Sequence, residues 1–142
     1  TLLPYRTDEL VLVVPTGHPL ARRKSVRLTD ALAFDFVGVH PGSAINNQLT
    51  RAAAEAQLPL KLRIQVTGYD ALCLMVAAGL GVGVMPRGSA ALYSGSLAVR
   101  TVTLAEPWAQ RRLVLCVRSY ESLASVSRLL VDHLRTSAGA SQ

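Results

Sequence analysis

Apolar residues gather in short runs along the chain, and polar or turn-forming residues separate these runs. Leu10–Val14 is an unbroken apolar run that ends in Pro-Thr-Gly-His-Pro, a pattern that predicts a buried strand followed by a turn. Residues 62–67 alternate apolar and polar side chains instead, which predicts a strand with one buried face. By the same criteria, further strands are predicted over residues 34–39, 82–85, 97–104 and 112–117.

Helical spacing of apolar residues fills several of the gaps between these strands. A short helical segment is predicted over residues 28–33, and Ser43 is placed to cap a longer helix. The apolar positions of the longer helix follow one face, and they are Ile45, Leu49, Ala52, Ala53 and Ala56. Its opposite, polar face carries Asn46, Asn47, Arg51 and Glu55.

Two more helices follow later in the chain. Asp70 is placed to cap a helix that Gly79 ends. Ser119 or Ser122 is placed to cap a last amphipathic helix reaching Leu134, after which residues 137–142 are expected to form a loose tail. The resulting order, β-α-β-α-β-α-β-β-β-α, indicates an α/β domain in which helices cover a mixed sheet. The strand, helix and strand over residues 62–85 predict a parallel βαβ unit within it.

Composition supports a packed core and narrows the class of protein. Hydrophobic residues make up 50% of the 142 residues and charged residues 17%, so disorder is excluded for most of the chain. No apolar run approaches the roughly 18 residues that span a bilayer. The net charge of +6, from 15 Lys+Arg against 9 Asp+Glu, comes from scattered groups without interleaved aromatic residues, which argues against nucleic-acid binding by this segment.

The start of the chain and its cysteines bear on the length of the whole protein and on its location in the cell. The chain opens on Thr1 without a visible signal peptide, so we expect it to be part of a longer protein. Cys73 and Cys116 lie in apolar strings, which favours buried reduced thiols over a disulfide and a cytoplasmic location.

The sequence lacks the usual signatures of catalytic, metal and cofactor sites. It contains no nucleophile elbow, zinc-protease motif, phosphate-binding lysine loop or Cys-x-x-Cys pair, and its three histidines have no metal-ligand spacing. Gly79-Leu80-Gly81-Val82-Gly83 follows a helix and precedes a strand, the reverse of a dinucleotide-binding fingerprint. We therefore expect no cofactor and no metal. An enzyme that uses Cys73 as its nucleophile stays open as an alternative, although a core thiol fits its apolar neighbours better.

Two places in the chain favour binding of a small anion. The predicted strands over residues 34–39 and 62–67 each lead through a Gly-containing loop into a helix, and helix N-termini bind anions through free N–H groups. Ser43 and Thr67 offer hydroxyl donors, and Tyr69 offers a flat wall with a polar tip. Plain helix capping explains Ser43 equally well, and Asp70 would repel an anion. His40, at the end of a strand, is equally compatible with a turn and with a pocket wall.

Four segments together resemble one family. They are LVLVVPTGHPLA, DFVGVHPGS, VTGYDALCLMVAAGLGVGVMP and RRLVLCVRSYESLASVSRLLVDHL, which cover residues from about 10 to 134. In their order and spacing they resemble the effector-binding domain of LysR-type transcriptional regulators. The resemblance implies a type 2 periplasmic-binding-protein-like fold, in which crossover strands join two α/β lobes and the effector binds between them.

The resemblance also implies a division of the chain. About residues 20–98 would form the second lobe, and residues 1–19 and 99–136 would form crossover strands and the returning C-terminal part of the first lobe. The opening part of the first lobe and the winged helix-turn-helix that reads DNA would lie upstream. A homodimer or homotetramer without membrane association is implied, and no enzymatic activity.

Family members take effector contacts from the two loops that the helix-terminus argument selects. The matching residues are His40, Pro41, Gly42, Ser43, Ala44, Val66, Thr67, Gly68 and Tyr69. The redox cysteines of the peroxide-sensing branch would fall at Ser43 and Ala52, which argues against a thiol switch. The predicted function is thus a sensor of a small, anionic metabolite that controls transcription allosterically. A periplasmic solute-binding protein of the same fold is the alternative.

Overall fold

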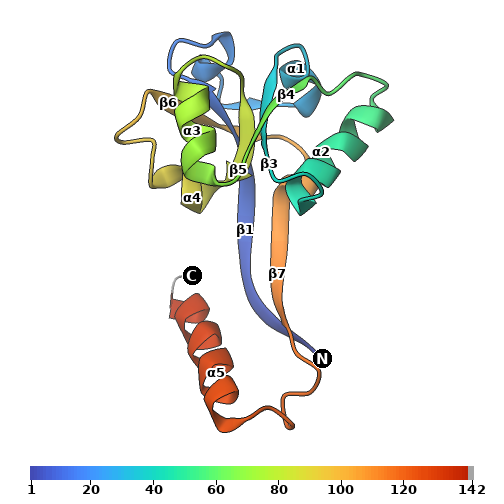
Figure 1. Ribbon diagram of the computed structural model, residues 1–142, viewed down its shortest axis with the longest axis vertical. Helices are drawn as coiled ribbons and strands as arrows, with labels where there is room; N and C mark the ends of the chain where they lie inside the picture. Colours follow the sequence, from blue (N-terminus) through green and yellow to red (C-terminus); the bar gives the residue numbers. More distant parts are fainter. Residues whose placement is uncertain (141–142) are drawn as a thin grey trace. The chain divides into compact units, whose positions relative to one another are not determined.

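A computed structural model describes residues 1–140 of the chain, which divide into two compact units (Figure 1). The larger unit is Glu9–Ala109, and the smaller comprises Thr1–Asp8 together with the chain from Gln110 onward. The larger unit is wider than the span of 20–98 expected for a second lobe. It includes the second half of the first strand and the whole of the sixth because these pair in its sheet.

The larger unit is a mixed sheet with helices on both faces. Its strands are β1 (Leu2–Pro15, shared with the smaller unit), β2 (Ser25–Val26), β3 (Phe36–Val39), β4 (Leu62–Val66), β5 (Gly83–Pro86) and β6 (Val99–Leu104). Its α-helices are α1 (Leu28–Ala31), α2 (Ala44–Glu55), α3 (Tyr69–Ala77) and α4 (Arg87–Ala91). Two 3₁₀ turns complete it, η1 (Pro19–Arg22) and η2 (Pro107–Ala109).

Strand pairing confirms the mixed sheet. One set of strands has the order β2-β6-β1-β5, in which β1 is antiparallel to β5 and β6 and β2 is parallel to β6. The other set is the parallel pair β3-β4, and a bridge between Phe36 and Val82 places the start of β5 beside β3. The strands β4 and β5 therefore run parallel and are joined through α3, as the predicted βαβ unit requires, with β3 between them.

The apolar run in β1 is continuous because both faces of its sheet are covered. Leu10, Leu12 and Val14 pack with the inner face of α2 in one hydrophobic cluster. Val11 and Val13 point the other way and pack with α3 in a second cluster. All five side chains are at most 1% exposed. A strand buried on both faces loses the polar-apolar alternation of a half-buried strand, which explains why the sequence reads as an unbroken run.

The smaller unit contains the first part of β1, β7 (Gln110–Cys116) and α5 (Ser125–Ala140). β7 pairs with β1, and the terminal ammonium of Thr1 donates to the carbonyl of Val117 at 2.7 Å. Arg111 binds Asp8 through two hydrogen bonds of 2.7 and 2.8 Å. On the next residue of β1, within the larger unit, Glu9 accepts two hydrogen bonds from Arg87.

Several predicted boundaries were wrong. The first strand begins at Leu2 and not at Leu10, because pairing with β7 extends it beyond the apolar run. α1 ends at Ala31. The short elements β2 and α4 escaped prediction, because neither is long enough to show a periodic pattern.

Both ends of the last helix also differ. α5 begins at Ser125, because residues 119–124 form turns in which Ser122 Oγ donates to Ser119 O and the Arg128 guanidinium donates to Tyr120 O. The helix continues to Ala140, so residues 137–140 are helical where a loose tail was expected. The rest of that expected tail, residues 141–142, lies outside the described residues.

A candidate effector-binding edge

Two loops meet at the carboxyl ends of β3 and β4. The strands are parallel neighbours with Val39 opposite Val66, so their following loops leave the same edge of the sheet. The N–H of His40 donates to the carbonyl of Val66 at 3.1 Å, which ties the first loop to the second. The structure thus brings the predicted residues 40–44 and 66–69 together. Pro41, Gly42, Ala44 and Thr67 are exposed, and Ser43 and Tyr69 are half-buried.

The first loop turns sharply into α2. His40 has φ 35° and Gly42 has φ 79°, so two residues adopt left-handed backbone within three positions. Ser43 caps the helix as predicted: its Oγ accepts from the N–H of Asn46 at 3.2 Å and donates to the carbonyl of Val39 at 3.1 Å. Among the described residues, the N–H groups of Ala44 and Ile45 have no protein acceptor. They are the donors that this helix end offers to an anion.

The second loop is capped differently from the prediction. Gly68, not Asp70, is the N-cap of α3, and Asp70 lies within the first helical turn. The Asp70 side chain folds back so closely that a Cβ on Gly68 would lie 2.8 Å from its Oδ1. This carboxylate already occupies the favourable end of the helix dipole. The N-terminus of α3 is therefore less suited to bind an anion than that of α2.

Asn46 is a residue that the periodic pattern misplaced. It was assigned to the outer face of α2, but its side chain is 5% exposed and its Nδ2 donates to the carbonyl of His40 at 3.1 Å. No protein donor reaches its Oδ1 within the described residues. Buried polar groups are nearly always hydrogen-bonded. Here the buried Asn46 amide satisfies the His40 carbonyl, in the loop that follows β3. One polar residue beside the apolar face of a predicted helix does not by itself indicate burial. The sequence alone therefore does not reveal this role of Asn46.

The cysteines fall into different surroundings. Cys73 is fully buried, as predicted, with its Sγ 3.5 Å from the sulfur of Met85. Burial, with the nearby Asp70 carboxylate, raises the pKa of its thiol, which disfavours the nucleophilic thiolate. Cys116 was predicted to be buried but is exposed, because in β7 it falls on the outward-facing side of the alternation.

The described residues hold no group of three or more His, Cys, Asp or Glu side chains close enough to bind a metal. Nor does any helix in that part of the chain have the length and apolar character needed to cross a membrane.

The fold is that of an α/β domain of the periplasmic-binding-protein-like type, and comparison with known proteins agrees. The family model "LysR substrate binding domain" matches residues 2–139. The chain therefore belongs to the LysR substrate-binding domain family.

Curated relatives are regulators of transcription. A probable RuBisCO transcriptional regulator of Synechocystis is 29% identical over 84 residues, which are 57% of this chain and 24% of the relative. The transcriptional activator protein LysR of Escherichia coli is 28% identical over 99 residues, 69% of this chain and 32% of the relative. The matches thus span about a third or less of these relatives. They favour the regulator over the periplasmic solute-binding protein.

Solved structures share the fold. The effector-binding domain of QuiR in complex with shikimate superposes with a TM-score of 0.77 at 24% identity, covering 99% of this chain and 66% of that one. The regulatory domain of CcmR from Synechocystis in complex with 2-PG gives a TM-score of 0.82 at 16% identity, covering 97% and 66%.

Proposed function

We propose that this chain is the effector-sensing part of a LysR-type transcriptional regulator and that it binds a small, anionic metabolite at residues 40–44 and 66–69. The observation that carries the proposal is the hydrogen bond from His40 to Val66, which holds the N-terminus of α2 beside the loop after β4. The two loops then carry two N–H groups of α2 without a protein acceptor, the Thr67 hydroxyl and the Tyr69 side chain, while Ser43 caps the helix. This set of donors suits a carboxylate or another small anion.

Control of transcription follows from differential binding. An effector that binds one conformation of the protein better than another shifts the population toward that conformation. Effector binding at one site and DNA binding at another are then linked by a coupling free energy. In our proposal a winged helix-turn-helix outside this chain contacts DNA, the protein acts as a homodimer or homotetramer in the cytoplasm, and no reaction is catalysed.

The test uses a bulky side chain at the edge in the full-length protein. Ala44 is exposed at the start of α2 and makes no capping bond, so Ala44→Trp blocks the edge without removing the Ser43 cap. Ala54→Trp, near the other end of the same helix and also exposed, is the matched control. A panel of small carboxylic acids that includes shikimate is screened by thermal shift. We expect at least one acid to raise the Tm of the parent and of A54W.

The same acid should lose its effect on A44W. At 100 times Kd a ligand stabilises the folded state by about 2.7 kcal/mol, which gives a shift of several degrees. An acid that stabilises A44W as strongly as the parent would show that it binds elsewhere. A panel in which no acid shifts the parent would contradict an anionic effector.

A further inference from the structure

A solvent-open hollow lies in the larger unit, away from the candidate effector edge. Its volume is about 440 Å³, a size that suits a small molecule. It is lined by Thr16, Ala21, Ser94, Leu97, Val99, Arg100 and Thr101. These residues come from the turn after β1, from η1, and from the loop that leads into β6 together with the first part of that strand.

Strand register places this hollow at the opposite end of the sheet from residues 40–44. Pro15 pairs with Val99, so the hollow lies where β1 ends. Leu10 pairs with Pro86 at the other end of the shared β1 segment, and β5 starts level with Phe36 through the bridge to Val82. His40, four residues after Phe36, is thus level with the Leu10 end. At about 3.3 Å per residue, the two places are separated by roughly 15 to 20 Å.

The lining carries one cation, three hydroxyls and an apolar floor. Among the described residues, no strand pairs with the outer edge of β6 here, because β2 pairs with β6 only further along, at Thr103 and Leu104. Arg100 is the charged residue of the lining, and Thr16, Ser94 and Thr101 are its hydroxyl-bearing residues. Leu97 and Val99 supply apolar surface. A guanidinium with hydroxyl neighbours matches a phosphate attached to a hydroxylated carbon body.

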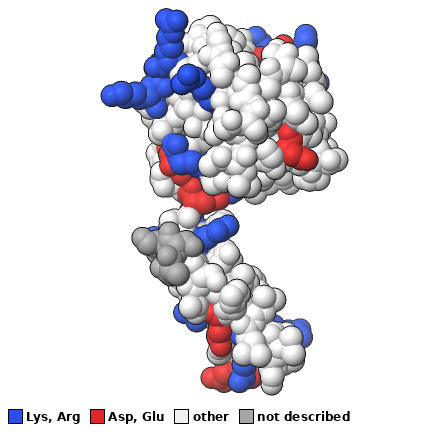
Figure 2. Space-filling model, turned by 90° about the vertical axis from the view of Figure 1, so that its left-hand side faces the viewer, with Lys and Arg blue, Asp and Glu red and all other residues white. Residues whose placement is uncertain are grey.

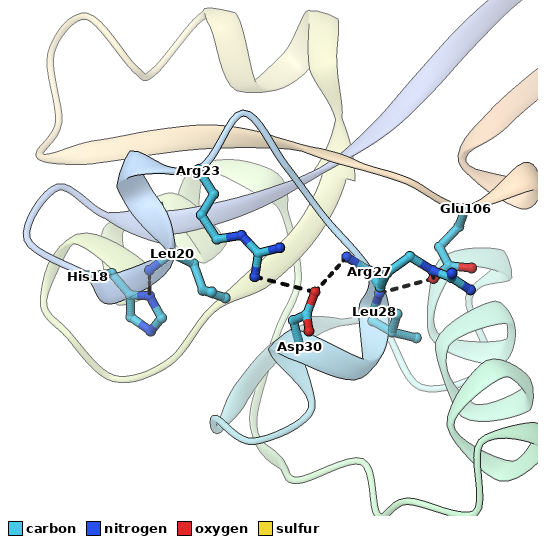
Figure 3. Close-up of polar contacts among 7 residues, drawn as sticks. All are labelled: His18, Leu20, Arg23, Arg27, Leu28, Asp30 and Glu106. Carbon is cyan, nitrogen blue, oxygen red and sulfur yellow. Dashed lines mark hydrogen bonds and ion pairs between the residues drawn. The ribbon is translucent and has the colours of Figure 1, made fainter.

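Charge around the hollow is positive and largely uncompensated. Arg22, Arg23 and Lys24 follow Ala21 directly and are exposed, and Figure 2 shows Lys and Arg side chains gathered at one corner of this unit. Of these three, Arg23 is neutralised by Asp30 at 3.4 Å, as Figure 3 shows. Within the described residues, Arg22, Lys24 and Arg100 have no carboxylate at ion-pair distance, and no acidic residue lines the hollow. The field at this corner therefore attracts anions.

We propose that this hollow is a second ligand site of the chain, which takes a small hydroxylated phosphate, with Arg100 binding the phosphate and Thr16 and Ser94 contacting the hydroxyls. The proposal is independent of the function assigned to the effector edge, because it uses other residues at the other end of the sheet.

The test is an amide chemical-shift titration of the ¹⁵N-labelled 142-residue chain with glucose 6-phosphate. We expect saturable shifts at the amides of Thr16, Leu97 and Thr101, with tighter binding than for inorganic phosphate and no shifts with glucose. Arg100→Gln should weaken binding by about tenfold or more, since a hydrogen bond to a charged group is worth roughly 1.5–3 kcal/mol. Arg51→Gln, which removes an exposed arginine of α2, is the control and should bind like the parent.

Thr16→Val is a second variant, which removes a hydroxyl and leaves the charge. It should weaken glucose 6-phosphate and leave inorganic phosphate unchanged. Equal weakening by R100Q and R51Q, or shifts that grow linearly without saturation, would reduce the hollow to a basic surface and overturn the proposal. Shifts centred on residues 40–44, or tighter binding of a random DNA duplex at the same amides, would overturn it as well.

Discussion

At the scale of single residues, two polar side chains stabilise loops by forming hydrogen bonds with backbone N–H or C=O groups. Asn46 lies at a polar position of the helical pattern, yet it is buried because its amide holds the His40 carbonyl in a loop with left-handed backbone. His18 has a similar role in the turn after β1. Its Nδ1 accepts the N–H of Leu20 at 3.1 Å as the N-cap of η1 (Figure 3). Its ring packs edge-on against Phe34 with the centroids 4.4 Å apart.

The His18 cap makes stability depend on pH. Burial lowers the pKa of this imidazole in the folded state below its ordinary value of 6.5. The unfolded chain therefore binds a proton more readily, and folding stability decreases as the pH falls from about 6.5 through the lower folded value. Protonation also removes the acceptor for Leu20. We expect urea unfolding to show this decrease in the parent between pH 7 and pH 5.

His18→Asn is the matched variant for this prediction. Asn is an equally good N-cap but does not titrate in this range, so the contribution of residue 18 to the pH dependence should vanish while stability at pH 7 stays within about 1 kcal/mol. Identical pH profiles of the parent and H18N would show that the His18 proton is not linked to folding.

At the scale of elements, the loops after β3 and β4 lead into two helices, α2 and α3, whose N-termini differ in how well they can bind an anion. Ser43 leaves two N–H groups of α2 without a protein acceptor, whereas the Asp70 carboxylate lies over the start of α3. The glycine-rich segment between α3 and β5 serves packing, as its position after a helix predicts. Gly79 ends α3 with φ 82°, and Gly81 lies against β3, where an added Cβ would be 2.8 Å from the carbonyl oxygen of Asp35.

Gly81→Ala should separate β5 from β3. The nearest atom, the carbonyl oxygen of Asp35, belongs to the backbone and accepts a hydrogen bond from the N–H of Val82. It therefore has little freedom to move away from an added Cβ. We expect a loss of about 1–3 kcal/mol in the free energy of unfolding, measured by chemical denaturation. Gly17→Ala is the control, because no atom lies within 4 Å of its added Cβ. Comparable losses for both variants would contradict the close approach at Gly81.

At the scale of the whole molecule, the two units differ in the completeness of their cores. In the larger unit β1 is covered on both faces by apolar clusters. In the smaller unit α5 leaves three large apolar side chains uncovered, with Val126 78% exposed, Leu129 69% and Leu130 58%. Such a stripe is typical of a surface that another segment or another chain covers.

Hydrogen exchange should reveal this difference. Amides of residues 11–14, in the core of the larger unit, should exchange only through global unfolding, whereas amides of α5 should exchange through local opening at a free energy lower by about 2 kcal/mol or more. Exchange measured by mass spectrometry on the 142-residue chain checks this. Equal protection of α5 and β1 would show that the apolar stripe is covered in solution, for instance by a second copy.

The sequence by itself determined the fold class, most of the long elements, the Ser43 cap and the two loops of the candidate edge. Periodicity and capping depend on neighbours within a few residues, and the spacing of motifs carried the family resemblance. Tertiary structure alone decided that Asn46 is buried, that Asp70 covers one helix end and that Cys116 is exposed. The same holds for the hollow beside Arg100, whose walls come from segments almost eighty residues apart. Such features depend on strand pairing across the sheet, which no local pattern contains.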